Sequence, residues 1–210
     1  MLEIIARLAN VAEGQYGHVT EAQAAAVGAS PDDVVRLLQA RVTEPVVDGV
    51  FRLRGGGRHP HPRLFAQWLL LDPERNGWER RNPQSGVVSH RAALRVHALG
   101  DWPGPTVEFT LAPGVAPHQA EGVQFHSAQL ESDEWQVVAG LPVTSPGRTL
   151  GDLAVNSHAD REALGRLAAA ILRRSLATHQ DLVRALNRCD PPQGGAKQLE
   201  DLLATQGGDL

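Results

Sequence analysis

The chain has 210 residues, of which 42% are hydrophobic and 21% charged, values typical of an ordered globular protein rather than a disordered or fibrous one. Its net charge of −4 at pH 7 gives no overall attraction to phosphate, so any nucleic-acid binding has to come from a local arrangement of basic side chains. The single cysteine, Cys189, excludes an internal disulfide and a thiolate metal site, which fits a reducing compartment and a packing role.

The first forty residues predict three helices. Apolar residues in positions 2–12 recur every three or four residues and form one face of a first helix ending near Gly14. After an extended piece at 17–19, the Thr-Glu-Ala-Gln sequence at 20–23 has the capping-box pattern and begins a very short second helix. The third helix begins after Ser30, because a serine cap followed by proline and two aspartates suits a helix N-terminus.

A hairpin and a break in the chain follow. Short apolar runs at 45–47 and 50–53 flank Asp48-Gly49, a dipeptide that favours a tight turn in which both central residues have positive φ. Three helices and a hairpin are the element order of a winged helix. Glycines and prolines then dominate residues 54–62. We therefore predict a winged-helix domain at 1–54, a linker at 55–61 and a second domain at 62–210.

The second domain is predicted to mix helices and strands. Apolar spacing predicts a helix around 64–71 and another that runs from a cap at Ser89 to Gly100. Alternation at 107–111 then places Glu108 and Thr110 on the face opposite its apolar residues. Four strands of one sheet are predicted in all, at 107–111, 123–126, 135–138 and 141–143.

From Ser145 onward the pattern is helical to the last apolar group, Leu199, Leu202 and Leu203. Long helices are expected around 164–172 and after Thr178. The predicted fold class is α+β, with an N-terminal winged helix-turn-helix domain and a larger C-terminal mixed α/β domain.

The N-terminal region combines a first helix, His-Val-Thr at 18–20, a short alanine-rich helix closed by glycine, and Gly-Val-Phe-Arg-Leu at 49–53. This combination resembles the winged-helix domain of AbiEi-type antitoxins. Later blocks resemble, in order, that family's C-terminal domain: Gly-Val-Val-Ser-His-Arg-Ala-Ala at 86–93, Val-Glu-Phe-Thr-Leu at 107–111, Gly-Val-Gln-Phe-His at 122–126, and Gly-Leu-Pro-Val-Thr-Ser-Pro-Gly-Arg-Thr-Leu at 140–150. The resemblance covers nearly the whole chain.

The resemblance implies a type IV toxin–antitoxin repressor of the abortive-infection class. Such a protein binds operator DNA, as repeats in its own promoter, and opposes a nucleotidyltransferase-like toxin without necessarily forming a stable complex with it. It is not an enzyme and needs no cofactor. Some relatives continue into a nuclease domain with a carboxylate and lysine core, but Lys197 is the only lysine here, so we expect no nuclease activity.

The DNA contacts are expected on the third helix, whose exposed face enters the major groove in this motif. Arg36 could donate two hydrogen bonds to guanine and Gln39 could pair with adenine. The alternative is that Asp32 and Arg36 form an ordinary exposed ion pair. Beside Arg36 and Gln39, the candidate DNA contacts are Thr20, Gln23, Ser30, Arg41, Arg52, Arg54 and Arg58.

Charge weighs against tight DNA binding. Residues 1–60 contain six arginines and seven acids, a net charge of −1, whereas most DNA-binding modules are basic. The alternative function is therefore a protein-interaction module that acts on a partner without specific DNA binding.

Other motifs carry weaker signals. The His59-Pro60-His61 sequence lacks a third ligand nearby, so no metal site is predicted, and Ser89-His90 is expected to begin a helix rather than to form a catalytic pair. Ser145, Arg148 and Thr149 mark either a partner surface or a helix cap with an Arg148–Asp152 ion pair.

No run approaches the roughly 20 apolar residues of a membrane span. The first twelve residues also lack the continuous apolar stretch of a signal peptide. We therefore expect a cytoplasmic protein that makes no membrane contact.

Overall fold

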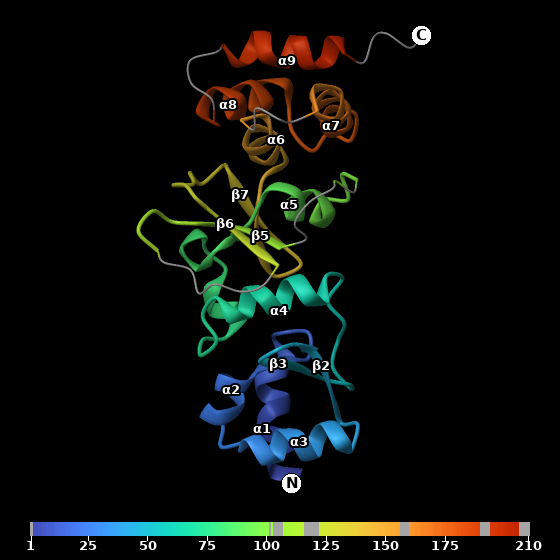
Figure 1. The fold of residues 1–210 in the computed structure, drawn as a ribbon, viewed down its shortest axis with the longest axis vertical. Coiled ribbons are helices and arrows are strands. Elements are labelled where there is room, and N and C mark those ends of the chain that lie inside the picture. The colour runs from blue at the N-terminus through green and yellow to red at the C-terminus, as the bar shows by residue number, and fades with distance from the viewer. Residues whose placement is uncertain are drawn as a thin grey trace. The chain divides into compact units, whose positions relative to one another are not determined.

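The computed structural model describes residues 2–100, 102, 107–115, 122–155, 160–189 and 194–205. Within these ranges the chain is a mixed α and β protein with two separate sheets, in agreement with the predicted α+β class. The elements gather in two compact units, each shown in Figure 1. The first includes residues 2–86 and the turn Ala139–Leu141, and the second contains most of the chain from Val87 onward.

The first unit contains a three-stranded antiparallel sheet of order β1-β3-β2. Its elements are α1 (Leu2–Glu13), β1 (His18–Thr20), α2 (Glu21–Ala26), α3 (Pro31–Gln39), β2 (Thr43–Val47), β3 (Val50–Leu53), α4 (Pro62–Leu70), and the short 3-10 helices η1 (Gly77–Arg80) and η2 (Pro83–Ser85). The predicted helices and hairpin of this region are confirmed.

The two predicted helix starts have the expected hydrogen bonds. Thr20 Oγ1 accepts from Gln23 N at 3.0 Å, and Gln23 Oε1 accepts from Thr20 N at 3.1 Å. Ser30 and the third helical residue, Asp33, form the same reciprocal pair. At the hairpin turn only Gly49 has a positive φ, of 74°, so the prediction of positive φ at Asp48 is wrong. A register shift between Pro45 and Val47 supplies the extra twist instead.

Helices cover both faces of the first sheet. Helices α1 to α3 and the sheet share an apolar core that includes Leu8, Val19, Leu37 and Phe51. Helix α4 contacts β1 and β2 and lies across the sheet from α1 to α3 (Figure 1). The unit therefore extends to Gly86, and the segment predicted as a linker, 55–61, lies within it, because α4 buries an apolar face that the sheet would otherwise expose.

The second unit combines a five-stranded sheet of order β6-β5-β4-β8-β7 with five helices in the described ranges. The elements are β4 (Val87–Val88), α5 (His90–Val96), β5 (Val107–Leu111), β6 (Val123–Ser127), β7 (Trp135–Val138), β8 (Leu141–Thr144), α6 (Pro146–Ala154), α7 (Arg161–Arg173), α8 (His179–Cys189) and α9 (Gly195–Ala204). The four predicted strands are confirmed. Strand β4 was not predicted, because two residues are too short to show alternation.

Strand β5 is buried on both faces, which the alternating sequence did not predict. Glu108 is 0% exposed and Thr110 is 2% exposed. The strand lies between β4 and β6, and α5 packs against it, so its polar side chains face protein rather than water.

Helices α6 to α9 group together beyond the sheet (Figure 1). They share a core that includes Leu150, Leu167, Ile171 and Leu182. No helix among the described residues is long and apolar enough to cross a membrane.

Candidate functional site

The outer face of α3 is the first candidate site. Val34 and Leu37 anchor the helix in the core, while Arg36 and Gln39 on the other side are exposed. The Arg36 side chain is 63% exposed, and its Nη1 lies 3.7 Å from Asp33 Oδ1. The predicted alternative, an Asp32–Arg36 pair, is therefore replaced by a loose contact with Asp33. A long exposed ion pair of this kind contributes little and leaves the guanidinium able to bind another anion.

Ser30 and Arg41 mark the two ends of α3, and both are exposed. The hydroxyl of Ser30 caps α3: its Oγ accepts from Asp33 N and lies 2.6 Å from Asp33 Oδ2. Arg41 has a φ of 56°, which turns the chain sharply from α3 towards β2. The helix is thus held at both ends with its outer face open.

Arg52 is a structural residue of the β2–β3 hairpin rather than a surface contact. It is 4% exposed, and its Nε and Nη2 donate to Glu44 Oε1 at 2.9 and 2.7 Å. Its Nη1 donates to the carbonyl oxygens of Gly56 and Gly57 at 3.1 and 3.3 Å. The prediction that Arg52 contacts DNA phosphate conflicts with this burial, because every guanidinium nitrogen already has a protein partner.

Three other arginines near the hairpin are exposed: Arg54, Arg58 and Arg63, which we call the arginine cluster. Arg54 is 50% exposed, with its Nε 3.6 Å from Glu44 Oε2. Arg58 and Arg63 line an open cavity of about 440 Å³ together with Glu44 and residues of β2. Hydrogen bonding by Arg52 holds the pKa of Glu44 below its ordinary value, aided by the charges of Arg54 and Arg58. Arg63 was not predicted, because its helix was assigned to the other domain.

Thr20 and Gln23 lie inside the first unit. Thr20 is 0% and Gln23 is 3% exposed. Thr20 Oγ1 donates to the carbonyl of Pro73 at 2.6 Å, and Gln23 Nε2 donates to Gln15 Oε1 at 3.1 Å and to the carbonyl of Arg75 at 3.0 Å. Their prediction as DNA contacts conflicts with these positions, since the chain after α4 covers them.

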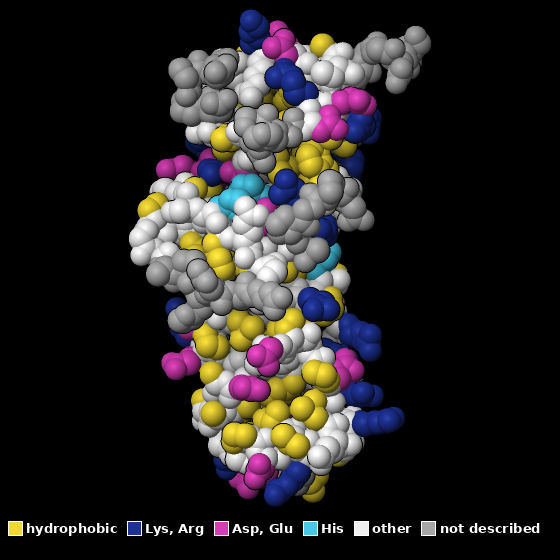
Figure 2. Space-filling model, in the orientation of Figure 1, with side chains coloured by type: hydrophobic (Ala, Val, Ile, Leu, Met, Phe, Trp, Pro, Cys, Tyr) yellow, Lys and Arg dark blue, Asp and Glu magenta, His cyan; other side chains and the backbone are white. Residues whose placement is uncertain are grey.

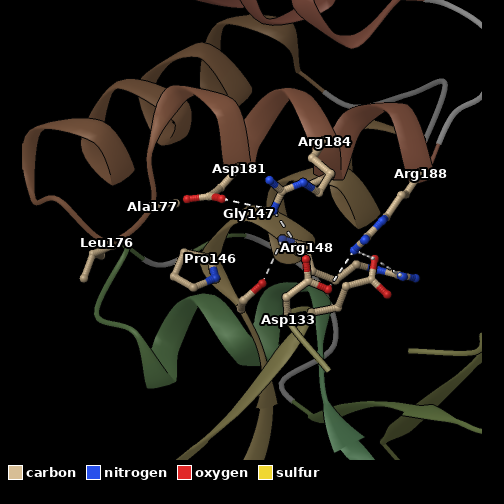
Figure 3. A pocket seen from close by; sticks show the side chains of 12 residues that line it. Asp133, Pro146, Gly147, Arg148, Leu176, Ala177, Asp181, Arg184 and Arg188 are labelled. Carbon is tan, nitrogen blue, oxygen red and sulfur yellow. Dashed lines mark hydrogen bonds and ion pairs between the residues drawn. The ribbon is translucent and has the colours of Figure 1, made fainter. Parts of the chain in front are cut away.

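The second candidate site is a pocket of about 230 Å³ between the start of α6 and helix α8 (Figure 3). Ser145 caps α6 by accepting from Arg148 N at 3.3 Å, as predicted. Thr149 is 0% exposed and donates to the carbonyl of Ser145 at 2.9 Å. Thr149 therefore supports the pocket from within and is not itself a partner surface.

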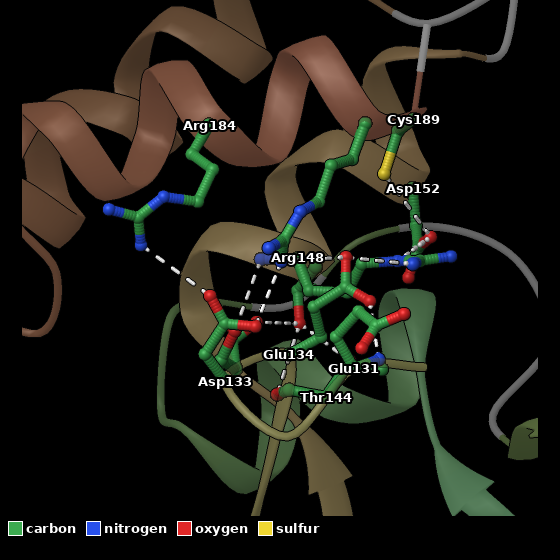
Figure 4. Close-up of polar contacts among 11 residues, drawn as sticks. Glu131, Asp133, Glu134, Thr144, Arg148, Asp152, Arg184 and Cys189 are labelled. Atoms are coloured by element: carbon green, nitrogen blue, oxygen red, sulfur yellow. Dashed lines mark hydrogen bonds and ion pairs between the residues drawn. The ribbon is translucent and has the colours of Figure 1, made fainter. Parts of the chain in front are cut away.

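Arg148 lies between two carboxylates at the base of the pocket (Figure 4). Its Nε is 2.7 Å from Asp152 Oδ1 and its Nη1 is 3.1 Å from Glu134 Oε1, while the side chain is only 11% exposed. The predicted Arg148–Asp152 ion pair is confirmed. Burial raises the pKa of Asp152 above its ordinary value, although Arg148 opposes that shift.

The exposed rim of the pocket carries the charges that sequence reasoning missed. Arg188 Nη1 lies 2.8 Å from Asp133 Oδ1, and Arg184 Nη1 lies 3.5 Å from Asp133 Oδ2. These three side chains are between 37% and 45% exposed. Arg184 and Arg188 are four residues apart on α8, so the helical spacing could have placed them on one side. Three arginines and three acids line the pocket, which leaves it without net charge.

Cys189 shows no nucleophilic arrangement, and Ser89, although it pairs with His90, is 0% exposed and so closed to a substrate. Burial raises the pKa of Cys189 to about 12, so its thiol stays protonated at neutral pH. Ser89 occupies the cap position of α5 but makes no capping hydrogen bond, because its Oγ lies 3.0 Å from His90 Nδ1 instead.

The histidines of the His59-Pro60-His61 sequence do not form a ligand group. His59 Nε2 donates to the carbonyl of Ala139 at 2.9 Å, and its Nδ1 accepts from His61 N at 2.9 Å, so both ring nitrogens are occupied.

His90, Glu108 and His126 come together at a place that the sequence did not indicate. Their three ligand atoms lie within 4.8 Å of one another, and no other group of this kind occurs among the described residues. Sequence spacing could not show it, because its members lie on three elements.

No model of a known protein family matches the chain, and no curated protein matches it. The geometry of the two candidate sites and the resemblance in sequence pattern are therefore the basis for assigning a function.

Proposed function

We propose that the protein is a type IV antitoxin that binds operator DNA and represses its own operon, with α1 to β3 acting as a winged helix. The observation that carries the proposal is the outer face of α3. Arg36 and Gln39 lie exposed on a helix whose other side is anchored in the core.

The order of elements supports a winged helix. Helices α2 and α3 are joined by a short turn at Gly28, and the antiparallel hairpin β2–β3 follows immediately. Strand β1 pairs with β3 and completes the sheet. In helix-turn-helix proteins the second of two such helices enters the major groove.

The proposed contacts divide between bases and phosphates. An arginine donates two hydrogen bonds to guanine and a glutamine pairs with adenine, so Arg36 and Gln39 are assigned to base edges. Ser30 and Arg41 lie at the ends of α3, and the arginine cluster lies beside β2, where side chains would meet the DNA backbone. Figure 2 shows arginine side chains, in dark blue, projecting from the first unit.

The antitoxin role is proposed for the pocket of the second unit. Its rim residues Asp133, Arg184 and Arg188 hold each other through exposed ion pairs, which a charged protein surface could replace at small cost. The partner is a nucleotidyltransferase-like toxin. The protein opposes this toxin in the cytoplasm, and it does so without catalysing a reaction and without a cofactor. Arg148 and Thr149 keep the pocket in shape.

Repression is tested with a reporter gene fused to the DNA directly upstream of the protein's own reading frame. Wild-type protein should lower expression, and Arg36→Ala and Gln39→Ala should restore it. Arg166→Ala is the matched control, since Arg166 is also an exposed helical arginine, 53% accessible and paired with an acid. Equal repression by wild type and Arg36→Ala would exclude α3 as the reading helix.

The antitoxin role is tested separately by co-expression with a nucleotidyltransferase-like toxin, whose gene the proposal places beside the protein's own gene. Wild-type protein should restore growth, and the charge reversals Asp133→Arg and Arg188→Glu should reduce that rescue. If rescue is complete while upstream DNA is not repressed, the alternative applies: an interaction module without specific DNA binding, which the net charge of −1 in residues 1–60 favours.

A further inference from the structure

His90, Glu108 and His126 are brought together by the sheet of the second unit. Strands β5 and β6 are parallel, with Glu108 opposite Gln124 and Thr110 opposite His126. His126 is thus two residues beyond the partner of Glu108, which puts both side chains on the same face. At the end of β4, Ser89 N donates to the carbonyl of Glu108 at 3.0 Å and sets His90, the first residue of α5, beside the same carboxylate.

The distances suit a metal ion. His126 Nε2 lies 3.4 Å from Glu108 Oε1. Two ligand atoms bonded at about 2.0–2.2 Å to a tetrahedral ion are separated by roughly 3.4 Å. The rings of His90 and His126 stack with centroids 3.5 Å apart, and one ligand atom from each of the three residues lies within 4.8 Å of the others. Coordination of one ion requires the two rings to move out of this stack, since imidazoles on a tetrahedral ion point at it along different directions.

The surrounding groups hold the ligands in the required orientation. Glu108 Oε2 accepts from Arg91 N at 2.9 Å, which leaves Oε1 directed at the imidazoles. His90 Nδ1 lies 3.0 Å from Ser89 Oγ, and a hydrogen bond there leaves Nε2 as the ligand atom. Partners of this kind fix the tautomer and ring orientation of metal-binding histidines. His90 also has a φ of 51°, a backbone strain that is common at functional sites.

The buried carboxylate of Glu108 suits a cation, a place that the Arg91 guanidinium partly fills. Glu108 is 0% exposed, and a buried carboxylate requires a compensating positive charge. The compensating group now present is Arg91, whose Nη1 is 3.6 Å from Glu108 Oε1 and whose buried Nε has no hydrogen-bond partner.

We propose that His90, Glu108 and His126 bind one divalent transition-metal ion of the zinc class, in place of the predicted absence of a metal site. Two imidazoles and one carboxylate are ligands that Zn²⁺ accepts. The fourth ligand is water, which enters beside His126, a side chain that is 24% exposed. Figure 2 shows histidine side chains reaching the surface of the second unit.

The test is calorimetric titration of the chelator-treated full chain with Zn²⁺, together with the visible absorption of the Co²⁺ form. We expect one ion per chain and a four-coordinate Co²⁺ spectrum. His126→Ala and Glu108→Gln should each weaken binding at least tenfold, and Ser89→Ala by about ten- to a hundredfold. His179→Ala, which removes an exposed histidine outside the group, should change nothing.

The Zn²⁺ affinity of Arg91→Gln distinguishes a metal site from a cluster that only stabilises the fold. The substitution removes the competing cation while keeping the backbone N–H that orients Glu108, so Zn²⁺ affinity should rise at least severalfold. Circular dichroism checks that each variant is folded. The proposal is overturned if the wild-type chain binds no Zn²⁺ at micromolar concentration, or if His126→Ala binds it with unchanged affinity and stoichiometry.

Discussion

His59 shows how a residue in a flexible-looking sequence becomes part of a core. It stacks on Phe65 with ring centroids 4.5 Å apart and is 3% exposed. Its two hydrogen bonds require the neutral tautomer with the proton on Nε2, since Nδ1 accepts from a backbone N–H. Burial accordingly lowers the pKa of His59 to about 4.

The lowered pKa of His59 predicts a pH dependence of stability. Above about pH 6.5 the ring is neutral in the folded and unfolded states, and its full contribution is present. As the pH falls from about 6.5 to 4, the unfolded state takes up a proton first, so the free energy of unfolding decreases. His59→Gln should reduce this slope by up to about 1.4 kcal/mol per pH unit, measured by urea denaturation. An unchanged slope would mean that His59 is not buried as described.

Arg80 is the second buried residue with a large predicted effect. It is 0% exposed and donates to the backbone carbonyls of Trp68, Leu69 and Asp72 at 3.0–3.1 Å, with its guanidinium 4.6 Å from the Trp68 ring. Desolvation lowers its pKa to about 10, which leaves it charged at neutral pH. The guanidinium therefore ties the end of α4 to η1.

Arg80→Met should lower the free energy of unfolding by about 3 kcal/mol or more, because several buried carbonyls lose their donor. Arg80→Lys should recover only part of this, since an ammonium cannot reach carbonyls in the planar arrangement of a guanidinium. The exposed neighbour Arg81 provides the control, and Arg81→Met should have little effect. Equal stability of Arg80→Met and Arg81→Met would contradict the role of Arg80.

At the level of elements, the positions of most helices and strands were read correctly from local signals, whereas long-range packing was not. The caps at Thr20 and Ser30 depend on residues three apart, so the sequence contains the whole pattern. The burial of Glu108 depends on strands from distant parts of the chain and on α5. Some polar residues predicted as exposed, such as Arg52, are buried. The prediction failed because their hydrogen-bond partners could not be identified from the sequence alone.

Close packing of α6 and α8 gives a prediction at this scale. A Cβ added at Gly151 would lie 2.7 Å from Cys189 Sγ and 3.0 Å from the carbonyl oxygen of Ala185. Gly151→Ala should therefore destabilise the second unit by about 1–3 kcal/mol. Adding Cys189→Ala should recover part of that loss, a coupling that a double-mutant cycle measures. Gly55→Ala, where a Cβ meets nothing within 4 Å, should be neutral.

At the scale of the whole molecule, each unit presents a different kind of surface. The first carries the outer face of α3 and the arginine cluster, while the second carries a charge-balanced pocket and the group of His90, Glu108 and His126. The candidate site in the first unit was partly predictable, because Arg36 and Gln39 follow from helix periodicity. Arg63 was not, because its place depends on α4 packing against the first sheet.

Fluorescence-anisotropy titration with the DNA directly upstream of the reading frame shows whether α3 reads operator DNA. Wild-type protein should bind that DNA more tightly than a scrambled duplex, and Arg36→Ala should lose the preference. Affinity should fall with salt, and Arg54→Ala and Arg58→Ala should each reduce the slope by about 0.9. Equally weak binding to both duplexes, or an unchanged preference in Arg36→Ala, would mean that α3 does not read operator DNA.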